Sequence, residues 1–116
     1  MVIEMSKYHS VRVYDPQYGT FDSKGEYERF KDLVLMEKAG LIAGLKRQVP
    51  YELAPARTRA DGTKQRAVTY VADFRYLDKR TGEWVTEDYK GFRTDAYKIK
   101  RAWMYEKYKI DIKETT

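Results

Sequence analysis

Apolar residues recur at helical spacing between residues 22 and 39. They fall on one side of a helix with 3.6 residues per turn: Tyr27, Phe30, Leu33 and Val34. Either Asp22 or Ser23 stands where a helix N-cap is needed, and Gly40 followed by Leu41 supplies a common C-terminal stop. The pattern therefore predicts a helix that ends near Ala39 and packs through one face.

Alternation of apolar and polar residues predicts strands on both sides of this helix. Residues 10–21 have this alternation around the turn sequence DPQYG, which is typical of a small hairpin. Three further strands are expected at 47–54, 66–77 and 83–90. The polar connections that contain Gly62 and Gly82 have hairpin composition, so these strands should form an antiparallel meander.

A second helix is expected over residues 94–107, and the segment IDIKE after it predicts a final edge strand. The residues expected on its packed face are Ala96, Ile99, Ala102 and Trp103. After the N-terminal arm and hairpin of residues 1–21, the element order is α, β, β, β, α, β. At 116 residues this order predicts one α/β (α+β) domain, residues 1–116, with a mixed central sheet flanked by helices.

Composition narrows the cellular setting. The chain has no cysteine, no apolar run as long as a membrane span, and no apolar core of a signal peptide in its first ten residues. Disulfides and thiolate metal sites are therefore excluded, and the expected location is the cytoplasm, without a membrane partner.

Positive charge is concentrated in two stretches. The formal net charge is +5. The stretch from Arg57 to Arg66 contains four basic residues and one acid, and the stretch from Arg93 to Lys113 contains seven basic residues and three acids. Such clusters fit either a polyanionic partner, usually nucleic acid, or ordinary solvated faces.

The strand sequence VTEDYK holds two acids and a lysine. Strand side chains alternate, so Asp88 and Lys90 share one face and Glu87 points to the other. Asp73 interrupts the apolar strand YVADF, where an acid is costly unless it is paired or bound to a metal. Because the two strands are expected to pair, Asp73 and Asp88 could lie close together.

Glu26 has two interpretations. With Ser23 it forms the capping box S-x-x-E, in which the glutamate satisfies a backbone donor. At 100° per residue it also lies between Phe30 and Leu33 on the apolar face, so it points toward the sheet. Three carboxylates without His or Cys suit Mg²⁺ or Mn²⁺ and imply phosphodiester chemistry, in which Lys90 could orient a water or offset developing charge.

The motifs FDSKGEYERF, YVADFRY and EDYKGF resemble those of the PD-(D/E)xK nucleases, and more closely a small family of phage and prophage proteins. That family is similar in pattern to phage Holliday-junction resolvases of the endonuclease I type. The resemblance implies a restriction-endonuclease-like fold and Mg²⁺-dependent cleavage of DNA in recombination or packaging. It assigns Glu26, Asp73 and Asp88 as metal ligands and Lys90 as the catalytic lysine.

Two departures and several further candidates accompany this assignment. Ala72 stands where the family has proline, and Glu87 is the alternative ligand if the strand is bulged. Branched DNA and a homodimer in the cytoplasm of a bacterial host are the expected partners. The candidate substrate contacts are Gln48, Arg57, Arg59, Lys98 and Arg101. The alternative functions are a non-catalytic nucleic-acid-binding module of the same fold, and a protein whose acids are dispersed on the surface.

Overall fold

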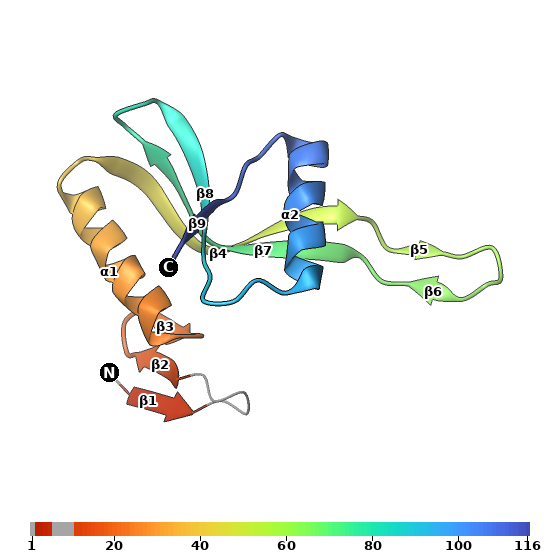
Figure 1. Cartoon of the computed structure of the whole chain (residues 1–116), viewed down its shortest axis with the longest axis horizontal. Helices are drawn as coiled ribbons and strands as arrows, with labels where there is room; N and C mark the ends of the chain where they lie inside the picture. Colours follow the sequence, from red (N-terminus) through yellow and green to blue (C-terminus); the bar gives the residue numbers. More distant parts are fainter. Residues whose placement is uncertain (1, 6–10) are drawn as a thin grey trace.

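The computed structural model describes residues 2–5 and 11–116 (Figure 1). Its strands are β1 (Val2–Met5), β2 (Val11–Asp15), β3 (Gly19–Phe21), β4 (Ile42–Ala54), β5 (Arg57–Thr58), β6 (Lys64–Gln65), β7 (Val68–Asp78), β8 (Glu83–Tyr89) and β9 (Lys113–Thr115). Its helices are α1 (Lys24–Lys38) and α2 (Asp95–Tyr108). The mixed α and β composition confirms the predicted class.

The central sheet has the order β4-β7-β8-β9. β4, β7 and β8 are antiparallel, and β9 lies parallel to β8 at the edge. The predicted meander and final edge strand are therefore confirmed. β4 begins at Ile42, five residues before its expected start. The residues before the expected start show no apolar–polar alternation, and a bulge at Gly44, with φ of +65°, lets the strand continue through them.

A separate small sheet precedes α1. β2 and β3 form the predicted hairpin, and β1 adds a third antiparallel strand that alternation did not predict. Residues 6–10 of the predicted N-terminal arm, including the one histidine, His9, lie outside the described residues.

Two apolar clusters lie along β7. Phe74 and Tyr76 pack with the buried face of α1, while Tyr70 and Ala72 pack with α2. The α1 face is the predicted one and contains Tyr27, Phe30 and Leu33. The residues between these two clusters on β7 and β8 therefore lie between the two helices (Figure 1).

The predicted packing face of α2 is wrong. The buried residues of this helix are Tyr97 and Met104, whereas Ala96, Ile99, Ala102 and Trp103 are exposed. These two buried side chains are seven residues apart and form a narrow packing face. The wider set of apolar residues in the helix sequence predicted a different face. In the part of the chain that the structure describes, no helix is long and apolar enough to cross a bilayer.

Candidate active site

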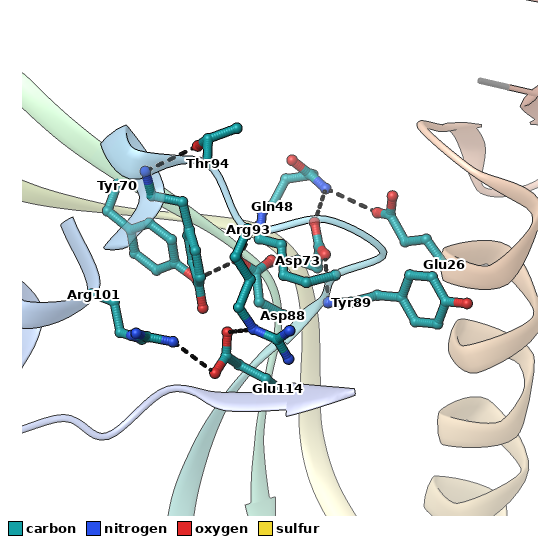
Figure 2. Close-up of polar contacts among 12 residues, drawn as sticks. Glu26, Gln48, Tyr70, Asp73, Asp88, Tyr89, Arg93, Thr94, Arg101 and Glu114 are labelled. Atoms are coloured by element: carbon teal, nitrogen blue, oxygen red, sulfur yellow. Dashed lines mark hydrogen bonds and ion pairs between the residues drawn. The ribbon is translucent and has the colours of Figure 1, made fainter. Parts of the chain in front are cut away.

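Asp73 and Asp88 meet where the pairing of β7 and β8 stops. The paired residues run as far as Phe74 and Glu87, so the next positions, Asp73 and Asp88, face each other. The N–H of Asp73 donates to Asp88 Oδ1 at 3.3 Å, and the N–H of Tyr89 donates to Asp73 Oδ2 at 2.8 Å (Figure 2). The two carboxylates thus replace backbone carbonyls as acceptors and are held together between the strands. The predicted proximity of Asp73 and Asp88 is confirmed.

Glu26 reaches this point from the first turn of α1. Its N–H donates to Ser23 Oγ at 3.0 Å, and its Oε2 accepts the N–H of Asp22 at 3.2 Å. Glu26 is 3% exposed. Both interpretations from the sequence hold, because one carboxylate oxygen serves the helix cap and the other points to the sheet. We call Glu26, Asp73 and Asp88 the carboxylate cluster.

Gln48 connects α1 to β7. Its Nε2 lies 3.3 Å from Glu26 Oε1 and 3.5 Å from Asp73 Oδ1, so one side-chain amide bridges two acids (Figure 2). Gln48 was expected as a substrate contact, and the structure places this exposed residue against two acids of the cluster. Both carboxylate oxygens lie within hydrogen-bonding reach of a single nitrogen, which keeps the two acids near each other.

The backbone at Gln48 is strained. Its φ of 51° lies in the left-handed region, which costs a non-glycine residue about 1–2 kcal/mol. Consecutive strand residues normally point to opposite faces. Here Gln48 and Arg47 both approach Glu26, at 3.3 Å and 4.0 Å. The left-handed conformation thus occurs where an amide and a guanidinium approach the same carboxylate, and strained residues of this kind gather at functional sites.

Burial and crowding of like charges favour the neutral form of two acids. Burial, reinforced by the neighbouring carboxyls of Asp88 and Glu26, raises the pKa of Asp73 to about 9. Burial, together with the negative charge of Asp22, raises the pKa of Glu26. The metal-free cluster therefore holds a proton near neutral pH, and a bound cation would offset the same repulsion.

Lys90 stands beside Asp88, as alternation predicted. Its Nζ lies 3.3 Å from Asp88 Oδ2 and 4.5 Å from the centroid of the Tyr97 ring. The hydroxyl of Tyr70 donates to the same Oδ2 at 2.7 Å. Lys90 also lines an open cavity of about 300 Å³, together with Tyr70, Thr94, Tyr97 and Lys100. A substrate phosphate could reach the ammonium group from this side.

Glu87 is engaged elsewhere. Its carboxylate accepts hydrogen bonds from Arg29 Nε at 2.6 Å, Arg29 Nη2 at 2.9 Å and the Tyr76 hydroxyl at 2.6 Å. Thr115 adds a fourth donor at 3.3 Å. Burial alone would raise the pKa of Glu87, but the bonds from Arg29 and Tyr76 hold it below its ordinary value. The structure thus gives Glu87 a structural ion pair with α1, and Asp88 is the better ligand candidate.

We expect Glu87→Gln to weaken the fold and to leave the candidate chemistry intact. Losing the charge that pairs with Arg29 should cost about 2 kcal/mol near pH 7. Because the pKa of Glu87 is lowered in the folded protein, this cost should start to shrink as pH falls below the ordinary value of 4.5, where the unfolded chain binds a proton first. It should vanish only below the lowered folded-state pKa, where both states bind a proton. Urea unfolding over a series of pH values from 7 downward measures it. DNA cleavage within about threefold of wild type supports Asp88 as the ligand, and loss of cleavage by the folded variant would restore Glu87.

The candidate substrate contacts divide into three groups. Arg57 and Arg59 are exposed on the β5–β6 hairpin, away from the carboxylate cluster (Figure 1). Lys98 is exposed on α2. Arg101, also on α2, was expected as a substrate contact, but its Nη1 donates to Glu114 Oε1 at 3.0 Å (Figure 2). A β9 carboxylate therefore already pairs with Arg101.

Two residues near the cluster were given no role from the sequence. Tyr70 reaches Asp88, and Arg47 lies beside Glu26 while its guanidinium donates to the carbonyls of Tyr18 and Thr20. Tyr70 opens the motif YVADFRY and Arg47 belongs to no motif, but the contacts of both depend on strand register. Knowing the exact pairing of β4, β7 and β8 would have been needed to predict them.

The donor set of the cluster suits a hard divalent cation. Among residues 11–116, no three or more His, Cys, Asp or Glu side chains are gathered closely enough to hold a metal ion as they stand. The oxygens of the cluster are instead occupied by the Gln48 amide, three backbone N–H groups, and the Tyr70 hydroxyl. Carboxylate and amide oxygens are the ligands that Mg²⁺ and Mn²⁺ accept, and the raised pKa of Asp73 indicates a deficit of positive charge.

A family model described as "Protein of unknown function (DUF1064)" matches residues 5–115. The matched range includes the carboxylate cluster, Gln48 and Lys90. No curated protein and no solved structure matches the chain.

Proposed function

The chain belongs to the DUF1064 family of proteins of unknown function, and we propose that it is a metal-dependent DNA endonuclease. The order α1, β4, β7, β8, α2, β9 supports a restriction-endonuclease-like core, the finer fold that the sequence resemblance implies. The observation that carries the proposal is the convergence of Glu26, Asp73 and Asp88, from three different elements, beside the ammonium group of Lys90.

Burying neighbouring acids costs free energy of folding, so this arrangement indicates a function. Three acids lie close together, two of them almost fully buried, and burial raises the pKa of Glu26 and Asp73. Groups perturbed in this way cluster at catalytic and cation-binding sites. Dispersed surface acids would be solvated instead, so the third interpretation from the sequence has no support here.

The residues of the chain would divide the work as follows. Glu26, Asp73 and Asp88 would hold Mg²⁺ or Mn²⁺, which when bound acts as a Lewis acid toward the scissile phosphate and lowers the pKa of a water. Lys90 donates to the phosphate or to the attacking water, and offsets the negative charge that develops. Gln48 and Tyr70 orient the acids that they contact, Gln48 for Glu26 and Asp73 and Tyr70 for Asp88.

Branched DNA, cut by a homodimer in phage recombination or packaging, is the substrate class that we propose from the sequence resemblance. One carboxylate cluster per chain can cut one strand, so a symmetric junction requires two chains. Phe92 precedes α2, and Ile99 and Trp103 lie on it. These exposed apolar residues offer a surface that a second chain could cover. The competing proposal is a non-catalytic module that binds nucleic acid with the same fold.

The test is a cleavage assay on three DNA forms. Purified protein is incubated with four-way junction, linear duplex and single-stranded DNA, in Mg²⁺, Mn²⁺ or EDTA. We expect cleavage with either metal, none in EDTA, and the fastest rate on the junction. Binding without cleavage under every metal condition would favour the non-catalytic module.

A further inference from the structure

The β5–β6 hairpin projects from the body of the molecule. It continues β4 and β7 outward, beyond both helices (Figure 1). Residues 55–64 are all exposed, and none of the side chains from 55 to 67 is buried. A two-stranded hairpin without an apolar face is marginally stable by itself, so packing does not explain this extension.

The turn of the hairpin is well specified. Asp61 Oδ1 accepts hydrogen bonds from the Thr63 N–H at 3.0 Å and the Thr63 hydroxyl at 2.6 Å. Gly62 adopts φ of +88°, which glycine tolerates without strain. The one acid of the hairpin is therefore used to form the turn, although Arg59 Nη1 also lies 3.9 Å from its other oxygen.

The rest of the hairpin is basic. Arg57, Lys64 and Arg66 line a shallow hollow of about 400 Å³, and no acid contributes to its lining. Arg59 lies beside the turn. An extended ribbon with four cations and a single, engaged carboxylate is complementary to a polyanion, and the hollow suits a convex backbone such as that of a duplex.

The reach of the hairpin matches the geometry of DNA. Lys64 is nine residues from Asp73 along β6 and β7, which corresponds to about 30 Å at about 3.3 Å per residue. One turn of B-DNA is about 34 Å. The major groove is also wide enough to admit a two-stranded β-ribbon. A duplex with one phosphate at the carboxylate cluster would therefore present its next turn to the hairpin.

We propose that the β5–β6 hairpin is a DNA-binding arm that contacts the duplex about one helical turn from the phosphate at the carboxylate cluster. This rests on the proposed nuclease function, and it adds a second contact zone that sets the minimum length of duplex the protein grips. The arm contributes affinity through phosphate contacts and touches no reacting atom.

The test compares two variants of equal charge. The arm variant combines Arg57→Gln, Arg59→Gln, Lys64→Gln and Arg66→Gln. The control variant combines Lys38→Gln, Lys46→Gln, Lys79→Gln and Arg80→Gln, which are exposed and lie elsewhere on the molecule. Thermal melting confirms that both are folded, as expected for side chains outside the core.

Binding is measured in EDTA by fluorescence anisotropy over a series of salt concentrations, with a duplex of about 40 base pairs and one of about 12. For the long duplex, we expect the arm variant to bind at least about tenfold more weakly than the control. The slope of log affinity against log salt should also be shallower for the arm variant than for the control by about 2–3, because each lost phosphate contact reduces the slope by about 0.9. The short duplex should bind wild type and arm variant alike.

The outcomes separate the arm from the nuclease. Equal binding and equal salt slopes for the arm and control variants would overturn the arm, whether or not the wild type cleaves DNA. An arm effect in a wild type that cleaves no DNA would keep the hairpin as a DNA contact and refute only the nuclease. Failure of the wild type to bind any duplex would overturn the arm and would leave the nuclease to the cleavage assay on junction DNA.

Discussion

Replacing Lys90 with alanine should slow DNA cleavage by about 10²–10³-fold and leave DNA binding nearly unchanged. Preorganised donors beside a reacting phosphate typically contribute a factor of this size. Lys90 Nζ is 3.3 Å from Asp88 and also lines the open cavity next to the cluster, so its charge lies between the acids and an approaching substrate. Since the interaction strengthens as charge develops, its loss should appear in kcat more than in KM.

Single-turnover cleavage of a labelled four-way junction in Mg²⁺ measures this effect, with anisotropy in EDTA for affinity. Lys38→Ala, an exposed lysine at the end of α1, is the matched control and should cleave at the wild-type rate. A Lys90→Ala protein that cleaves within about threefold of the control would remove this lysine from the chemistry.

Asp73→Asn should have opposite effects on activity and stability. Cleavage should fall by at least about 10³-fold, because the amide removes a charged oxygen ligand from the cluster. The metal-free variant should nevertheless be more stable than wild type at alkaline pH. Burial and the carboxyls of Asp88 and Glu26 penalise ionised Asp73, and asparagine carries no charge in that position.

The sign of the pH effect follows from proton binding. The pKa of Asp73 is raised from 3.8 to about 9 in the folded state, so between these values the folded protein holds a proton that the unfolded chain has released. Stability of metal-free wild type should therefore fall as pH rises through this window. Asp73→Asn lacks this term and should gain at least about 1 kcal/mol over wild type at pH 8–9, or about 4 °C in Tm.

Melting curves in EDTA at pH 5, 7 and 9 test the stability effect. Asp32→Asn, an exposed residue of α1, controls for the general effect of removing one negative charge. Addition of millimolar Mg²⁺ at pH 8 should raise the Tm of wild type and not that of Asp73→Asn. A wild type whose stability does not decline between pH 5 and pH 9, or an Asn variant that gains as much from Mg²⁺ as wild type, would contradict the assigned role of Asp73.

Local patterns in the sequence determined much of the fold and part of the site. Ser23 and Thr94 cap the two helices through bonds to residues three positions later, which is why both helices could be predicted within about two residues. Strand alternation was enough to place Asp88 and Lys90 on one side and Glu87 on the other. The turn around Gly82 made β7 and β8 neighbours and so brought Asp73 to Asp88.

Tertiary structure alone decided the contacts that span the chain. Arg29 and Glu87 are 58 residues apart and Tyr70 and Asp88 are 18 apart, so their meeting depends on the exact register of the sheet and on the position of α1. The left-handed backbone of Gln48 is compensated by its contacts with Glu26 and Asp73 and had no local signal. The packed face of α2 was mispredicted for the same reason. Hydrophobicity shows that a helix has apolar residues, whereas the shape of the sheet beneath it selects which of them are buried.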